Sequence, residues 1–125
     1  MATVIHTANA PAAVGPYSQA VDCGDFLFCS GQIPLVPETG LMVEGGIEEQ
    51  ARQMFANIKA VLAAAGLSFS NVVKTTVFMT DLGQFAVFNS IYAEYFPENP
   101  PARSCVEVSA LPKGALVECE VIAKK

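Results

Sequence analysis

Two stretches near the C-terminus decide the expected fold: RSCVEVSA (residues 103–110) and LVECEVIA (residues 116–123). Both alternate apolar and polar residues, a period of two that is typical of β-strands with two different faces. The segment between them, LPKGA (residues 111–115), contains Pro and Gly, which are common where a chain reverses. The pattern therefore predicts strands at 104–110 and 116–123, joined as a hairpin.

The register of this hairpin assigns its side chains to faces. Pairing the apolar sets turns five residues toward the core: Val106, Val108, Val117, Cys119 and Val121. By parity, the opposite face carries the polar set and one cysteine: Arg103, Cys105, Glu107, Glu118 and Glu120. One interpretation of this set is a solvated ion network, in which each pair contributes little stability. The other is an anion site at a subunit interface, where an Arg binds a carboxylate and a Glu transfers protons.

Two further segments carry the 3.6-residue period of amphipathic helices. The first helix is predicted over Ile47–Ala65, with acidic residues in its first turn, which the helix dipole favours, and Gly66 as its stop. The second helix is predicted over Gln84–Phe96, capped by Asp81 and ended by Pro97.

The rest of the chain has the pattern of short strands. They are predicted at Val4–Ile5, Gln19–Asp22, Phe26–Ser30 and Val72–Thr80, the last being rich in β-branched residues. Residues 23–25 (CGD) indicate a hairpin turn between the second and third strands. With no internal repeat or linker, the order β-β-β-α-β-α-β-β predicts one domain over residues 1–125. Its class is α+β, with both helices packed on one face of a mixed β-sheet.

The composition is too apolar for a small globule on its own. Hydrophobic residues make up 52% of the chain and charged residues 15%, against a usual charged share of about 25%. Disorder is excluded, because so apolar a chain can offset its ordering entropy. A domain of this size hides only about two-thirds of its unfolded surface. We therefore expect part of the apolar surplus to be buried against another copy of the chain.

The charge pattern excludes two classes of partner. The net charge is −5 and no basic run is longer than Lys124-Lys125, which argues against nucleic acid. No apolar stretch approaches the ~20 residues that cross a bilayer, so no membrane partner is expected.

Residues 1–16 lack the basic and apolar pattern of a secretory signal. We therefore expect a cytoplasmic protein.

The cysteine and histidine content narrows the possible chemistry. The cysteines form no C-x-x-C pair and are expected to be reduced thiols: Cys23, Cys29, Cys105 and Cys119. His6 is the only histidine, which argues against multi-His metal sites and against a Ser-His-Asp triad. No glycine-rich phosphate loop is present. An enzyme with this sequence is expected to use carboxylates, Arg, Tyr and backbone groups, with no metal and no cofactor.

Several motifs together resemble one known family. They are GPYS (residues 15–18), SGQIP (30–34), VKTTVF (73–78) and PARSCVEV (101–108), the last followed by VECE (117–120). In this order they resemble the Rid family of reactive intermediate deaminases, also called YjgF-like proteins, over nearly the whole chain. Because Arg103 is present, the sequence resembles the RidA branch of this family, since other branches often lack this arginine.

The resemblance implies a fold, an assembly and an activity. The fold is chorismate-mutase-like and the assembly is a homotrimer, with sheets around a central barrel, helices outside and sites in the clefts between subunits. The implied enzyme is a 2-iminobutanoate/2-iminopropanoate deaminase. It hydrolyses small 2-imino acids, which arise from the enamine products of pyridoxal-phosphate-dependent dehydratases, to 2-oxo acids and ammonia.

The resemblance also implies roles for particular residues. Arg103 would bind the substrate carboxylate, and Glu118 would hold and activate the attacking water. The backbone around Cys105 would contact the imine or oxo group, with covalent catalysis by its thiol as the alternative. The remaining pocket residues, partly from a neighbouring subunit, would be Tyr17, Ser30, Gly31 and Asn89. Neighbouring positive charge is expected to favour the ionised form of Glu118.

A second function from a different class fits the same residues. The protein could be a non-catalytic regulator that senses a metabolite or binds a protein through the same cleft between subunits. Turnover of an imine beyond its uncatalysed hydrolysis separates the two hypotheses.

Overall fold

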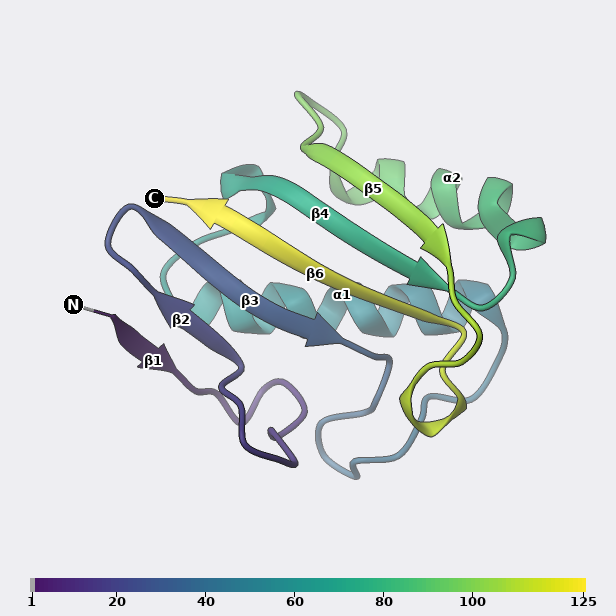
Figure 1. The fold of residues 1–125 in the computed structure, drawn as a ribbon, viewed down its shortest axis with the longest axis horizontal. Coiled ribbons are helices and arrows are strands. Elements are labelled where there is room, and N and C mark those ends of the chain that lie inside the picture. The colour runs from purple at the N-terminus through teal and green to yellow at the C-terminus, as the bar shows by residue number, and fades with distance from the viewer. Residues whose placement is uncertain (1) are drawn as a thin grey trace.

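The computed structural model describes residues 2–125 and confirms the predicted order of elements (Figure 1). The strands are β1 (Thr3–Ile5), β2 (Ala20–Asp22), β3 (Phe26–Gln32), β4 (Val72–Met79), β5 (Ala102–Glu107) and β6 (Val117–Lys124). The helices are α1 (Ile47–Ala64) and α2 (Phe85–Tyr95), with short 3₁₀ turns at Phe69–Asn71, Leu82–Gln84 and Pro112–Gly114. The predicted bounds differ from these by a few residues at most.

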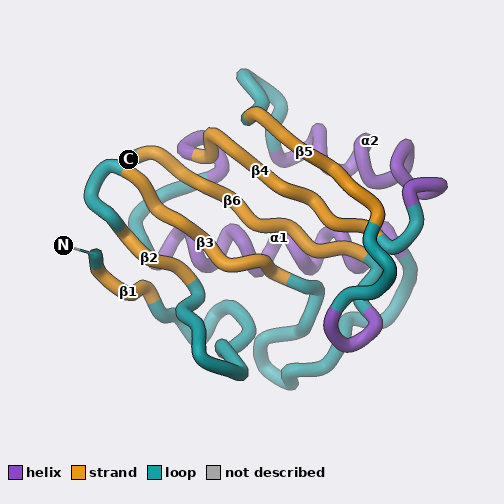
Figure 2. The backbone as a smooth tube through the Cα atoms, in the orientation of Figure 1, coloured by secondary structure: helices purple, strands orange, loops and turns teal. Residues whose placement is uncertain are grey.

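The strands of the described chain form one mixed sheet, and both helices lie behind the same face of it (Figure 2). The strand order is β1-β2-β3-β6-β4-β5. β4 and β5 are parallel, and the other neighbouring pairs are antiparallel. The predicted α+β class, with two helices on one face of a mixed sheet, is therefore confirmed. We call the side of the sheet without helices the open face.

The hairpin predicted around residues 23–25 is also confirmed. β2 and β3 pair antiparallel, with Asp22 opposite Leu27. The backbone N–H of Cys23 donates to the Phe26 carbonyl at 2.8 Å. Gly24 takes a φ of +95°, a conformation that glycine adopts without steric cost.

The core lies between the sheet and the helices. α1 directs its apolar stripe at the sheet and buries Met54, Phe55, Ile58 and Leu62. The Phe55 ring stacks on Tyr95, with ring centres 4.3 Å apart, and so joins α1 to α2. The other rings within about 6 Å of it complete an aromatic cluster: Phe69, Phe88, Tyr92 and Phe96.

The predicted C-terminal hairpin is wrong, because β4 lies between β5 and β6. β5 follows α2 and runs parallel to β4, as in a strand–helix–strand unit, whereas β6 runs antiparallel along the other side of β4. The loop between them crosses the end of β4. There Val108 N donates to Met79 O at 2.8 Å and Thr80 N donates to Leu116 O at 3.2 Å. Pairing β4 on both sides satisfies backbone groups that a simple hairpin would leave open along one of its edges.

The predicted faces are correct for β6 and wrong for β5. In β6, Val117, Cys119 and Val121 are buried under the helices, while Glu118 and Glu120 lie on the open face. The β4–β5 register pairs three buried β4 residues with the polar β5 positions: Thr75 with Arg103, Val77 with Cys105, and Met79 with Glu107. Paired residues share a face, so these β5 residues lie on the helix side. Val106, predicted for the core, is 44% exposed on the open face.

Replacing Phe55 by Ala is expected to lower the free energy of unfolding by about 3–5 kcal/mol, because it leaves a cavity inside the aromatic cluster. Urea unfolding followed by circular dichroism measures the change. The control is Val87→Ala at an exposed position of α2, for which we expect less than about 0.5 kcal/mol. Equal losses in the two variants would show that the cluster does not join the helices energetically.

Candidate functional site

Arg103 is held in a defined geometry on the helix side of the sheet. Its Nη1 donates to the Asn89 Oδ1 at 2.7 Å. The guanidinium carbon lies 4.6 Å from the centre of the Tyr92 ring and 5.3 Å from that of Phe85, within the range of cation–π attraction. Tyr92 is itself fixed by a 2.8 Å hydrogen bond between its hydroxyl and that of Thr75. We call Arg103, Asn89, Tyr92, Phe85 and Cys105 the arginine group.

The arginine group can bind a carboxylate. A guanidinium carries five N–H donors in a planar fork, and among the described residues Arg103 hydrogen-bonds only Asn89. Most of its donors therefore remain for a ligand. A pocket of about 420 Å³ opens beside it, lined by Asn89, Tyr92, Ala93, Phe96, Pro100, Pro101 and Arg103. Charge-assisted, bidentate contacts of Arg with a carboxylate are among the stronger hydrogen bonds in proteins.

Cys105 is next to Arg103 but is poorly suited to covalent chemistry. The two residues share a second hollow with Leu82 and Phe85. Burial raises the pKa of the Cys105 thiol, and the positive charge of Arg103 opposes this rise without cancelling it. A thiol must lose its proton to act as a nucleophile. The raised pKa therefore disfavours attack by the Cys105 sulfur, and a contact through the backbone around Cys105 stays a prediction.

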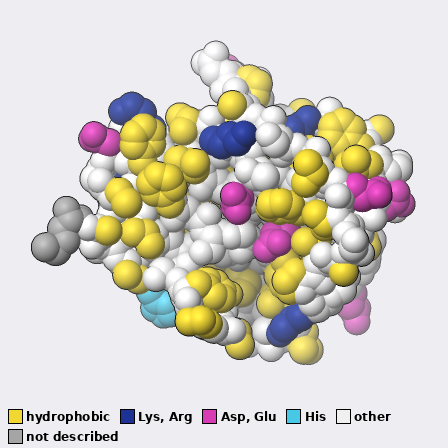
Figure 3. Space-filling view, in the orientation of Figure 1, with side chains coloured by type: hydrophobic (Ala, Val, Ile, Leu, Met, Phe, Trp, Pro, Cys, Tyr) yellow, Lys and Arg dark blue, Asp and Glu magenta, His cyan; other side chains and the backbone are white. Residues whose placement is uncertain are grey.

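Glu118 lies on the open face against Gly31. A β-carbon built on Gly31 would come within 2.6 Å of the Glu118 Oε2. No side chain can occupy that space without displacing the carboxylate, so the glycine is required for this position of Glu118. Figure 3 shows the open face, where acidic side chains stand near the centre among hydrophobic ones. We call Glu118, Gly31, Tyr17 and Ser30 the glutamate group.

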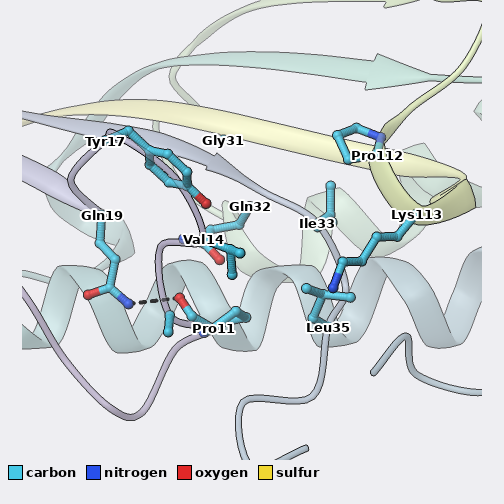
Figure 4. A pocket seen from close by; sticks show the side chains of 11 residues that line it. Pro11, Val14, Tyr17, Gln19, Gly31, Gln32, Ile33, Leu35, Pro112 and Lys113 are labelled. Carbon is cyan, nitrogen blue, oxygen red and sulfur yellow. Dashed lines mark hydrogen bonds between the residues drawn. The ribbon is translucent and has the colours of Figure 1, made fainter. Parts of the chain in front are cut away.

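Tyr17 and Gly31 line a pocket of about 320 Å³ (Figure 4). Its other lining residues are mainly apolar: Pro11, Ala12, Val14, Gln19, Gln32, Ile33, Leu35, Pro112 and Lys113. The walls come from the loop before β2, the end of β3 and the turn before β6. Such a pocket suits a short aliphatic substituent, with polar groups at its rim.

Ser30 fixes the loop that carries Tyr17. Its hydroxyl donates to the Ser18 carbonyl at 2.6 Å, and its backbone N–H donates to the Gln19 carbonyl at 2.9 Å. The hydroxyl proton is therefore already used in a hydrogen bond within the protein and cannot be donated to a ligand at the same time. Ser30 can accept a hydrogen bond from a ligand, but its main effect in this geometry is to hold the loop against β3.

The environment of Glu118 differs from the one that sequence analysis predicted. Burial raises the pKa of its carboxyl, and the negative charge of Glu120 raises it further. We expected positive charge beside Glu118 to favour the ionised form, and within one chain this is wrong. The reason is that Arg103 lies on the other face of the sheet. The raised pKa makes the Glu118 carboxyl a stronger proton acceptor than an exposed glutamate.

The predicted site residues thus form two groups that one chain does not bring together. The arginine group faces the helices and the glutamate group faces away from them. Phe85 and Tyr92, which contact the guanidinium of Arg103, were not among the predicted site residues. Their spacing from Asn89 on the predicted helix, four and three residues, is the signal for a shared face.

Each helix within residues 2–125 is either too short or too polar to cross a membrane. The same residues contain no cluster of three or more His, Cys, Asp or Glu side chains that could hold a metal ion.

The fold is that of a known class of small α+β proteins. The sequence pattern of the family described as Endoribonuclease L-PSP matches residues 7–125. The chain belongs to this family, which is the Rid or YjgF-like family that the sequence motifs resemble.

Relatives match over almost their whole length. A RutC family protein of Pyrococcus horikoshii is 55% identical over 125 residues, which cover 100% of this chain and 99% of the relative. A Salmonella typhimurium protein named 2-iminobutanoate/2-iminopropanoate deaminase is 51% identical over 126 residues, covering 98% of each. The crystal structure of E. coli TdcF with bound serine superposes with a TM-score of 0.94 at 45% identity, again covering 98% of each chain.

Replacing Glu120 by Gln is expected to lower the pKa of Glu118, because it removes the like charge two residues away on the same face. A carbon-13 NMR titration of the side-chain carboxyls measures this shift. Glu98→Gln, at an exposed position outside the glutamate group, should leave the Glu118 titration unchanged. An unchanged pKa in Glu120→Gln would show that burial alone sets it.

Proposed function

We propose that the protein is a hydrolytic deaminase of small 2-imino acids. Water adds to the imine carbon, the C–N bond breaks, and a 2-oxo acid and ammonia leave. The observation that carries the proposal is the arginine group, which offers a stacked guanidinium with free donors beside a pocket. The deaminase name of a 51% identical relative supports the same activity.

Substrate binding depends on Arg103. The carboxylate of the imino acid pairs with its free N–H donors, while Asn89 and the ring of Tyr92 keep the guanidinium in place. An imine is already electrophilic, so the protein needs to supply orientation and one proton-transfer group. The serine bound in TdcF is another small molecule with a carboxylate next to a nitrogen-bearing carbon.

Glu118 is the proposed proton-transfer group. In its ionised form it accepts a proton from the attacking water, and it then returns a proton to the departing nitrogen. Its raised pKa makes the carboxylate a better proton acceptor than that of an exposed glutamate. The adjacent pocket of Tyr17, Val14 and Leu35 would receive the aliphatic substituent of the substrate.

The site would be completed by two subunits of a homotrimer. Arg103 and Glu118 lie on opposite faces of one sheet, so a substrate that contacts both requires a neighbouring copy. The open face supports such an assembly: an apolar row of Val4, Val21, Phe28 and Ile122 crosses four strands in register. Val4 and Phe28 in this row are exposed in the single chain.

The activity is tested by coupling the purified protein to a threonine or serine dehydratase and following release of the 2-oxo acid. Arg103→Ala should abolish the acceleration, and Arg103→Lys should lose most of it, about tenfold or more, because an ammonium lacks the planar fork. Lys59→Ala, which removes an exposed cation on α1, should keep full activity. Full activity in Arg103→Ala would refute the site.

The shared site is tested by mixing two inactive variants. Random trimers of equal amounts of Arg103→Ala and Glu118→Gln should recover about one quarter of the wild-type activity, since that share of sites pairs two intact residues from neighbouring chains. Light scattering should give about three times the 13.2 kDa chain mass. No recovery in mixed trimers would mean that each site uses both residues of the same chain.

The coupled assay also decides between turnover and simple binding. A regulator would bind a 2-oxo acid at Arg103 without accelerating imine hydrolysis.

The family description names an endoribonuclease, but the net charge of −5 disfavours contact with an RNA backbone.

A further inference from the structure

We propose that Gln19 is a positioning residue, which fixes the loop carrying Tyr17 over the pocket of the glutamate group. Its consequence for turnover rests on the proposed function, whereas its effect on the loop does not. The residue is 2% exposed, although it is an amide and lies just before β2. Figure 4 shows its amide nitrogen directed at the Pro11 carbonyl, at the base of the pocket.

Both ends of the Gln19 amide bind the same backbone segment. Its Oε1 accepts from Thr7 N at 2.7 Å, and its Nε2 donates to Thr7 O at 3.0 Å and to Pro11 O at 2.9 Å. A weaker contact of 3.5 Å reaches Ala10 O. One side chain thus supplies a donor and an acceptor to a loop that has no helix or strand between residues 6 and 19.

This loop forms one wall of the pocket. Pro11, Ala12, Val14 and Tyr17 all come from it. The C-terminal end of the loop is tied to β3, where Ser30 donates to the carbonyls of Ser18 and Gln19. The Gln19 side chain holds the N-terminal part of the loop, at Thr7 and Pro11. Residues 12–17 therefore span two fixed points, and the pocket wall is set before any ligand arrives. Such pre-organisation lowers the cost of orienting a substrate.

A carboxylate of the same shape cannot replace this amide. In Gln19→Glu the neutral acid can accept from Thr7 N and donate to one carbonyl, but the ionised form has no donor and faces the carbonyl oxygens of Thr7 and Pro11. Burial and these carbonyls raise the pKa of the introduced group. The loop should therefore stay closed at low pH and be released as the pH rises through that pKa.

The test compares wild type, Gln19→Glu and Gln19→Met at about pH 6 and about pH 8. The measurement is hydrogen–deuterium exchange of residues 6–18, corrected for intrinsic rates. In Gln19→Glu the exchange should be slow at the lower pH and fast at the higher pH. In the uncharged isostere Gln19→Met it should be fast at both pH values. In the dehydratase-coupled assay, kcat/KM should fall by about tenfold under the same conditions.

Asn71→Asp is the matched control. The Asn71 amide also clamps backbone with both ends, accepting from Ser68 N at 3.0 Å and donating to Lys124 O at 3.1 Å, but at the other end of β6. This variant should change neither the exchange of residues 6–18 nor kcat/KM.

The outcomes are separable. Wild-type exchange in both Gln19 variants would overturn the proposal. Released loops with unchanged kcat/KM would overturn the positioning role. Absence of turnover in the wild type would refute the deaminase function, while pH-dependent exchange in Gln19→Glu would still support the clamp.

Discussion

The pairing of β4 on both of its edges determines the rest of the structure. With β5 on one side and β6 on the other, the register of each strand assigns its side chains to a face. Arg103 thereby lies under α2 and Glu118 lies on the open face. The separation of the two chemical groups follows from this backbone pairing, because alternate residues of a strand cannot change faces without shifting its register.

Buried amides then hold the irregular segments around the sheet. Asn57 of α1 donates to the Ile33 and Leu35 carbonyls, and Gln50 accepts from Leu116 N at the start of β6. Together with Gln19 they reach three loops that border one pocket. A buried amide is costly unless its hydrogen bonds are made, so each of these side chains specifies one loop conformation. These hydrogen bonds tie all three walls of the pocket to buried side chains.

Much of the fold followed from local patterns. The order of elements, the two helices and the first hairpin were predictable, since they depend on periodicity and turn residues within short segments. The place of β5 was not, because its pairing with β4 joins residues about thirty positions apart across α2. A strand–helix–strand order was visible in the sequence, but the short segment 111–115 favoured the simpler hairpin.

The sequence by itself determined the candidate residues for the proposed chemistry: Arg103 in a charge-poor chain, Glu118 in an alternating strand, and Gly31 as a pocket residue. The sequence also determined that the chain is more apolar than expected for a small globule on its own. The tertiary structure alone decided that Arg103 and Glu118 lie on opposite faces, that aromatic rings of α2 support the arginine, and that Gln19 closes the loop beside Tyr17. These facts depend on contacts between distant segments, which no local pattern encodes.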